Sequence, residues 1–267
     1  LLVFGVYLAI RAPLPSIAAL AALTAAALVS GFLLGKALWH YEPWTVGAPS
    51  VLRAIAPLAA WSTAGASVHW LFSQGYAYLA ANVLDITAVA AIAATRLMMM
   101  PVNLLSTGIG ALMLPLTVGW LQQHGPAVVL RRLGLFALAL SGVAVCYFAL
   151  LWVLRDFIFA EVLRKQFAQR DQLLLLWSGA FFLMTARDQL IYLLVARERF
   201  RQLTLIAFVS ATISLAASYF AMRRYGVIGA PLGVLVGEII NLTGIVLLSL
   251  RQTSAVTRAA ACAGAAS

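Results

Sequence analysis

Most of residues 1–250 fall into successive apolar segments of helix length, separated by a connecting stretch at 40–50 and another at 154–171. A helix needs roughly 20 apolar residues to cross a bilayer core about 30 Å thick. Some charged residues lie deep inside these segments, where charge persists only if protein or water shields it. They are Arg96, Arg187, Asp188 and Glu238. The sequence therefore predicts an all-α, polytopic membrane protein whose function centres on buried polar groups.

Composition supports the same class. Hydrophobic residues make up 64% of the chain and charged residues 10%, far below the roughly 25% charged share of soluble domains. The net charge of +10 is spread over loops and helix ends, which indicates membrane topology and excludes a nucleic-acid surface. The sequence has no phosphate-binding glycine loop, metal-ligand cluster or nucleophile elbow, so we expect no cofactor, no metal and no enzymatic activity.

The chain divides into four predicted parts. Residues 1–39 hold an apolar run too short to span and then a full span, so we expect the chain to begin inside a helix of a longer protein. Residues 40–50 contain two prolines and predict a linker between helical bundles. Residues 51–251 form the main helical bundle, and residues 252–267 an Ala-rich, disordered tail that the distribution of Lys and Arg places in the cytoplasm. The main bundle holds six predicted spans: 54–79, 86–120, 130–153, 172–196, 203–222 and 228–250.

The segment at 86–120 is too long for one perpendicular crossing, and it contains Pro101 and Pro115. Prolines kink membrane helices where neighbouring groups satisfy the freed carbonyl. We expect one long, bent helix, with two half-helices as the alternative.

Two polar stripes are candidates for the wall of a cavity. In the first, His69 shares a helix face with small and polar residues at spacings of three and four, which suits either a proton carrier or sugar ligand, or hydrogen bonds that only join helices. In the second, Arg96 and Asn103 lie along one side of the next span. A guanidinium that faces a cavity can bind phosphate or carboxylate; the alternative is a structural Arg bonded to helix-end carbonyls.

The remaining deep charges are Arg187, Asp188 and Glu238. Neighbours on a helix point about 100° apart, so Arg187 and Asp188 are not expected to pair and each should bond to another helix. Asp188 and Glu238 suit a coupling or gating role, with a structural role as the alternative.

Two rows of small residues recur every four positions in the last two spans. They are Ser210, Ser214 and Ser218, and Gly229, Gly233 and Gly237. Such rows let membrane helices approach closely, so they predict packing surfaces.

Two stretches carry a resemblance to a known family. One runs from Trp70 to Pro115 and contains the pair Arg96-Leu97 followed by two prolines; the other joins the last two spans through a turn at Tyr225–Ala230. Together they resemble the C-terminal portion of polysaccharide-biosynthesis flippases in the multidrug/oligosaccharidyl-lipid/polysaccharide exporter superfamily. The chain departs from that pattern near Gly75 and Tyr76, where an acidic residue of the family is absent.

The resemblance implies a two-lobe exporter fold, of which this chain would hold a six-helix C-terminal lobe and the last helices of the N-terminal lobe. It implies a transporter that moves a polyprenyl-pyrophosphate-linked saccharide, a lipopolysaccharide or exopolysaccharide precursor, across the bacterial inner membrane by alternating access. Polymerase or glycosyltransferase machinery would be its partner. The implied pyrophosphate ligands are Arg96 and Arg187, and the implied sugar contacts are His69, Gln74 and Asn103.

Two other functions stay open on the sequence alone. A multidrug or metabolite exporter of the same fold would place more acidic and aromatic residues in the cavity. A membrane polymerase or glycosyltransferase acting on lipid-linked sugars would need catalytic acids or histidines in an outer loop, and residues 154–171 offer only Asp156 and Glu161.

Overall fold

A computed structural model describes residues 49–162 and 169–264, together with scattered positions between 21 and 36. The chain divides into two compact units, Leu1–Ala56 and Pro57–Ser267, so the division lies six residues beyond the predicted end of the linker. The predicted parts at 1–39 and 40–50 lie largely outside the described residues. All features below belong to the second unit, except the first residues of the helix that begins at Pro49.

The described residues are helical and contain no strand. The elements are α3 (Pro49–Val83), α4 (Ile86–Leu97), α5 (Met100–Phe157), the π-helix η1 (Ile158–Val162), α6 (Arg170–Ala196), α7 (Phe200–Tyr225), the short 3-10 helix η2 (Gly226–Ile228) and α8 (Gly229–Gly264). Within the described ranges, three helical runs are long and apolar enough to cross a membrane: Met100–Glu161, Arg170–Ala196 and Phe200–Arg251. The described part of the protein is therefore helical and compatible with a membrane protein.

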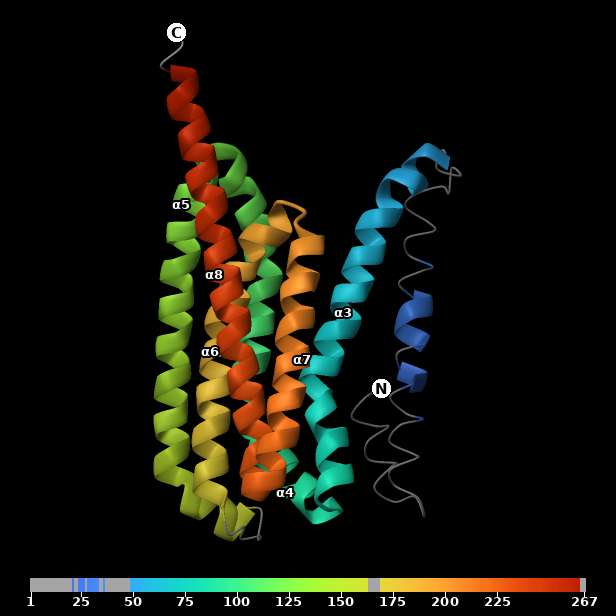
Figure 1. The fold of residues 1–267 in the computed structure, drawn as a ribbon, viewed down its shortest axis with the longest axis vertical. Helices are drawn as coiled ribbons and strands as arrows, with labels where there is room; N and C mark the ends of the chain where they lie inside the picture. Colours follow the sequence, from blue (N-terminus) through green and yellow to red (C-terminus); the bar gives the residue numbers. More distant parts are fainter. Residues whose placement is uncertain are drawn as a thin grey trace. The chain divides into compact units, whose positions relative to one another are not determined.

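Two of these runs fold back on themselves at a glycine. Gly125 (φ 75°, ψ 171°) interrupts α5, and Gly226 (φ 62°) follows α7; glycine adopts this region of φ without the steric cost of a side chain. The two arms of α5 are in contact near this turn, because the rings of Trp120 and Phe136 stack at 6.3 Å between centroids. Figure 1 shows the reversal within α5. Counted as separate arms, the helices overlap the ranges of all six spans predicted after residue 50, although α3 is not among the runs long and apolar enough to cross a membrane.

The segment 86–120, predicted as one long, bent helix with two half-helices as the alternative, is divided into two helices. Helix α4 ends at Leu97 and α5 begins at Met100, with a short turn at Met98 and Met99. Pro101 lies in the first turn of α5, where its missing amide hydrogen costs nothing, whereas within a longer helix its ring would clash with a carbonyl one turn earlier.

The close packing predicted for the two rows of small residues is confirmed. Helices α7 and α8 lie side by side (Figure 1), and the hydroxyl of Ser214 donates to the carbonyl of Gly233 at 3.0 Å. A Cβ added at Gly233 would overlap the backbone of Ser218, and one added at Gly237 would overlap the side chain of Ser214. The glycines therefore allow the two backbones to approach.

Helix α8 continues to Gly264. It therefore includes most of residues 252–267, which were predicted to form a disordered tail. Ala is the strongest helix former, and the Ala-rich composition that suggested disorder also extends the helix.

Aromatic packing surrounds the central part of the unit. The Trp177 ring lies 5.3 Å from that of Tyr76 and 6.1 Å from that of Phe181, between centroids. These side chains are buried together with Met99 and Ile92. The cluster joins α3, α4 and α6 and forms one wall of the site described below.

We predict that Gly233→Ala lowers the thermal stability of the protein. The added methyl group would overlap the Ser218 backbone, and overpacking of this kind costs typically about 1–3 kcal/mol. Gly142→Ala is the matched control, because a Cβ there meets nothing within 4 Å. Thermal unfolding in detergent should show a loss for the first variant alone; equal midpoints would refute close packing at Gly233.

Asp85 should stabilise α4 only while it is ionised. Its carboxylate accepts a hydrogen bond of 2.6 Å from the Ala88 amide at the helix N-terminus, and this bond, with one from Thr87, lowers the pKa of Asp85 below its usual value. Because the folded-state pKa is lowered, the stabilisation is present above the unfolded-state pKa and is lost as pH falls through the folded-state value.

We therefore expect Asp85→Ala to reduce the thermal midpoint at neutral pH, with a difference from the wild type that shrinks as the solution is acidified. Asp85→Asn keeps a capping oxygen that does not titrate, so its contribution should not vary with pH. A difference between Ala and wild type that is the same at all pH values would show that the charge plays no part.

Candidate functional site

A cavity of about 220 Å³ opens between the helices of the second unit. Its polar lining brings together four residues predicted to bind substrate, His69, Gln74, Arg96 and Asn103, and the predicted coupling residue Glu238. They come from α3, α4, α5 and α8. Aromatic and apolar side chains complete the lining: Phe72, Tyr76, Met100, Trp177, Phe181, Met184 and Val234. We call this space the first cavity.

Arg96 is held at the wall of the first cavity by neutral partners. One of its terminal nitrogens, Nη1, donates to the hydroxyl of Tyr76 at 3.0 Å and to Oε1 of Gln74 at 3.3 Å. Its Cζ lies 5.5 Å from the ring centroid of Tyr76 and 5.8 Å from that of Trp177, in range of cation–π attraction. Arg96 also lies in the last turn of α4, where the helix dipole favours a positive charge.

The charge of Arg96 has no acidic partner within 4 Å among the described residues. Its Nε is buried without a hydrogen-bond acceptor, and so is the indole Nε1 of Trp177. Buried donors without acceptors are rare and costly. Both residues line the first cavity, and the charge of Arg96 suits a ligand that brings hydrogen-bond acceptors and negative charge.

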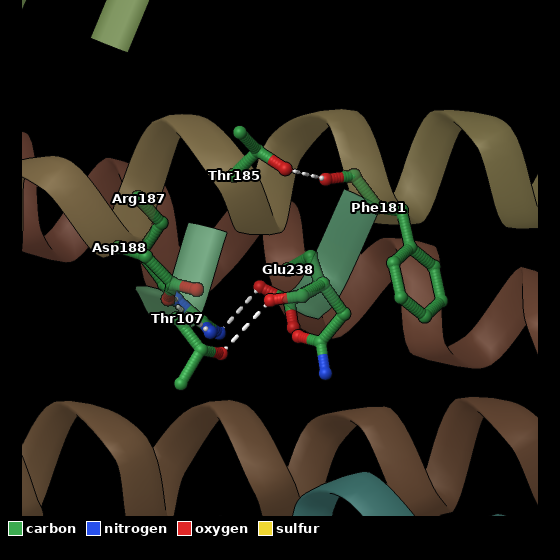
Figure 2. Close-up of polar contacts among 7 residues, drawn as sticks. Thr107, Phe181, Thr185, Arg187, Asp188 and Glu238 are labelled. Carbon is green, nitrogen blue, oxygen red and sulfur yellow. Dashed lines mark hydrogen bonds and ion pairs between the residues drawn. The ribbon is translucent and has the colours of Figure 1, made fainter. Parts of the chain in front are cut away.

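Arg187 has a different environment, because carboxylates surround it. Its Nη1 donates to Glu238 Oε2 at 2.6 Å, and its Nε and Nη2 donate to Asp188 Oδ1 at 3.1 and 2.8 Å. Figure 2 shows the three side chains turned toward one another. Arg187 and Glu238 are only 2% and 3% exposed. We call these three residues the ion triad; it joins α6 to α8.

The prediction that Arg187 and Asp188 do not pair is wrong. The 100° between neighbouring side chains holds near the backbone, but the long Arg side chain bends back so that two of its nitrogens reach the short Asp side chain. The expected partner on another helix does exist for Arg187, namely Glu238. Arg187 does not line the first cavity, and its charge is already matched by carboxylates.

A second cavity, of about 310 Å³, lies on the other side of the triad residues. Arg187 and Asp188 line it, and His69 lines both cavities. The rest of the lining is mostly apolar or weakly polar: Trp61, Ser62, Gly65, Ala66, Ile191, Phe200, Leu203, Thr204, Ala207, Asn241 and Ile245. The triad thus borders both cavities, with Glu238 on the first and Asp188 on the second.

Trp177 and Phe181 are site residues that the sequence did not reveal. Both lie within a predicted apolar span. Spacings of four, three and four residues nevertheless connect Trp177, Phe181, Met184 and Asp188 on α6. That spacing marks one helix face, and Asp188 lies on it. Counting back along α6 from Asp188 in steps of three and four residues would therefore have identified this face from the sequence.

No group of three or more His, Cys, Asp or Glu side chains that could hold a metal occurs in the part of the chain that the structure describes. No protein-family model matches this chain, and no curated protein and no solved structure is significantly similar to it.

We predict that Arg187→Met destabilises the protein far more than Glu238→Gln. The first change leaves two carboxylates without their cation, and breaking a buried ion pair in this way costs about 3–5 kcal/mol. The second leaves Arg187 bonded to Asp188 as a neutral pair. The measurement is thermal unfolding in detergent, with Arg223→Met as the control because Arg223 is exposed at the end of α7. Similar losses for the two triad variants would contradict a charge-based role.

Proposed function

We propose that this protein is a transporter that moves a lipid-linked saccharide, carried on polyprenyl pyrophosphate, across a bacterial inner membrane by alternating access. The observation that carries the proposal is the uncompensated guanidinium of Arg96 at the wall of the first cavity, beside the unpartnered indole N–H of Trp177. A pyrophosphate would bring the negative charge and the acceptors that these donors lack.

The remaining polar lining suits the sugar. Gln74 and Asn103 each offer an amide that donates and accepts, and His69 offers a ring nitrogen of either kind. The first cavity is smaller than the roughly 300–1,000 Å³ of pockets that enclose a drug-sized ligand. We infer that it receives the pyrophosphate and adjoining sugar only, while the lipid tail stays in the bilayer.

The finer architecture belongs to the same proposal. The helices after residue 50 would be the C-terminal lobe of a two-lobe exporter, with residues 1–39 as the end of the N-terminal lobe. The resemblance of Trp70–Pro115 to polysaccharide flippases supports this assignment, and rocking of lobes about a site at mid-depth is common to such transporters. In this proposal Arg187 holds α6 against α8, and Asp188 and Glu238 serve coupling or gating.

The proposal predicts that Arg96→Gln abolishes most export. In cells that lack the gene, lipid-linked saccharide should accumulate on the inner leaflet, and the wild-type gene should restore its outward transfer. Arg96→Gln should fail to do so because it removes the charge. Arg96→Lys keeps the charge but loses the planar fork of donors, so it should restore transfer in part.

Arg223→Gln is the control for loss of a cation outside the cavity and should restore transfer fully. Each variant is also purified and its thermal midpoint measured, which separates loss of fold from loss of function. A well-folded Arg96→Gln that transfers saccharide at the wild-type rate would rule out this proposal, as would an unchanged leaflet distribution in the deletion strain.

The second cavity favours one competing function. Its apolar lining includes Trp61 and Phe200 beside the partly exposed carboxylate of Asp188, a combination that suits an organic cation. An exporter of cationic drugs or metabolites should therefore bind such compounds with an affinity that falls in Asp188→Asn and is unchanged in Arg96→Gln. The saccharide transporter instead predicts that the affinity for its own substrate falls in Arg96→Gln.

A further inference from the structure

The ion triad carries more negative than positive charge. Arg187 supplies one cation, whereas Asp188 and Glu238 supply two carboxylates, and all three are bonded to one another. Unbalanced charge within a membrane is costly because the surrounding dielectric constant is low. A further positive charge or a bound proton would offset the excess.

Few other groups can supply that charge. The titratable or charged groups that line the two cavities beside the triad are His69 and Tyr76 of α3 and Arg96 of α4, and Tyr192 of α6 lies near Asp188. The groups contributed by α5, α7 and α8 are uncharged: Asn103, Thr204 and Asn241. Arg96 is the one permanent cation on the first cavity among the described residues, and it shares that cavity with Glu238.

We propose that the ion triad is a proton-binding site linked to oxyanion binding at Arg96. This inference rests on the proposed function, because it needs an anion in the first cavity. In this proposal Arg96, which lines the same cavity as Glu238, offsets the excess charge of the triad while that cavity is empty. An oxyanion bound to Arg96 neutralises the guanidinium charge, and the triad then takes up one proton from water, which forms an O–H bond on one of its carboxyl oxygens.

The geometry favours a proton over a metal ion. The guanidinium of Arg187 already occupies one oxygen of each carboxylate, so the pair cannot close around a cation that needs several oxygen ligands. A proton needs only one free carboxylate oxygen. Because Glu238 borders the first cavity and Asp188 the second, the proton can reach the triad from either cavity.

Linkage between two binding sites is reciprocal. If the bound anion strengthens proton binding, the bound proton strengthens anion binding by the same factor. If one proton is linked, the affinity for the anion rises by up to about tenfold for each unit by which pH falls. The slope should flatten once the triad is protonated before the anion binds.

Sulfate is a suitable probe because it stays fully ionised near neutral pH, so any proton taken up belongs to the protein. We expect calorimetric titration of the purified full chain with sulfate, repeated in buffers of different ionisation enthalpy, to show uptake of about one proton per sulfate bound. Sulfate binding without proton uptake would overturn the linkage and leave the proposed function standing. If no sulfate binds, both proposals fail.

Variants identify the group that takes the proton. Glu238→Gln and Asp188→Asn each make the triad neutral, so each should bind sulfate without proton uptake and with an affinity that does not vary with pH. Either variant suffices if the other does not fold. Asp85→Asn removes an exposed carboxylate remote from the cavities and should keep the uptake. Uptake that persists in folded Glu238→Gln and Asp188→Asn would overturn the assignment to the triad.

Discussion

The structure depends on how charge is compensated inside an apolar bundle. The four deep charges fall into two groups with different environments. Arg187, Asp188 and Glu238 are bonded to one another and join α6 to α8. Among the described residues, the recorded partners of Arg96 are neutral hydrogen-bond acceptors and aromatic rings. The first group can hold the fold together without a ligand, whereas the second offers a positive charge that a ligand can use.

Close helix packing allows both groups to exist at defined positions. The glycines of α8 let its backbone approach α7, and this contact places Glu238, which follows Gly237, at the junction with α6. On the other side, the break before Pro101 ends α4 one residue after Arg96, so the guanidinium lies at a helix end and beside the Trp177 ring. Backbone constraints therefore determine where the charges lie.

Periodicity was enough to predict part of this arrangement. Spacings of three and four on the span after residue 50 grouped His69 with its polar neighbours, and apolar length located the helices. Sequence patterns did not predict which groups pair across helices, because the pairing of Arg187 with Glu238 depends on how α6 and α8 meet in space. Nor did they predict the pair at Arg187 and Asp188, because rotation about the long Arg side chain is not fixed by helix geometry. Trp177 was missed because an aromatic residue in an apolar span has the same pattern whether it packs in a core or borders a cavity.

The proposed function requires that Arg96 face a space that an oxyanion can occupy. The most direct measurement is an experimental structure of the protein crystallised with selenate, whose selenium atom gives an anomalous signal. We expect an anomalous peak in the first cavity within hydrogen-bonding distance of Arg96 Nε and Trp177 Nε1, and we expect none at Arg187. A structure in which a carboxylate pairs with Arg96, or in which selenate binds only at Arg187, would contradict it.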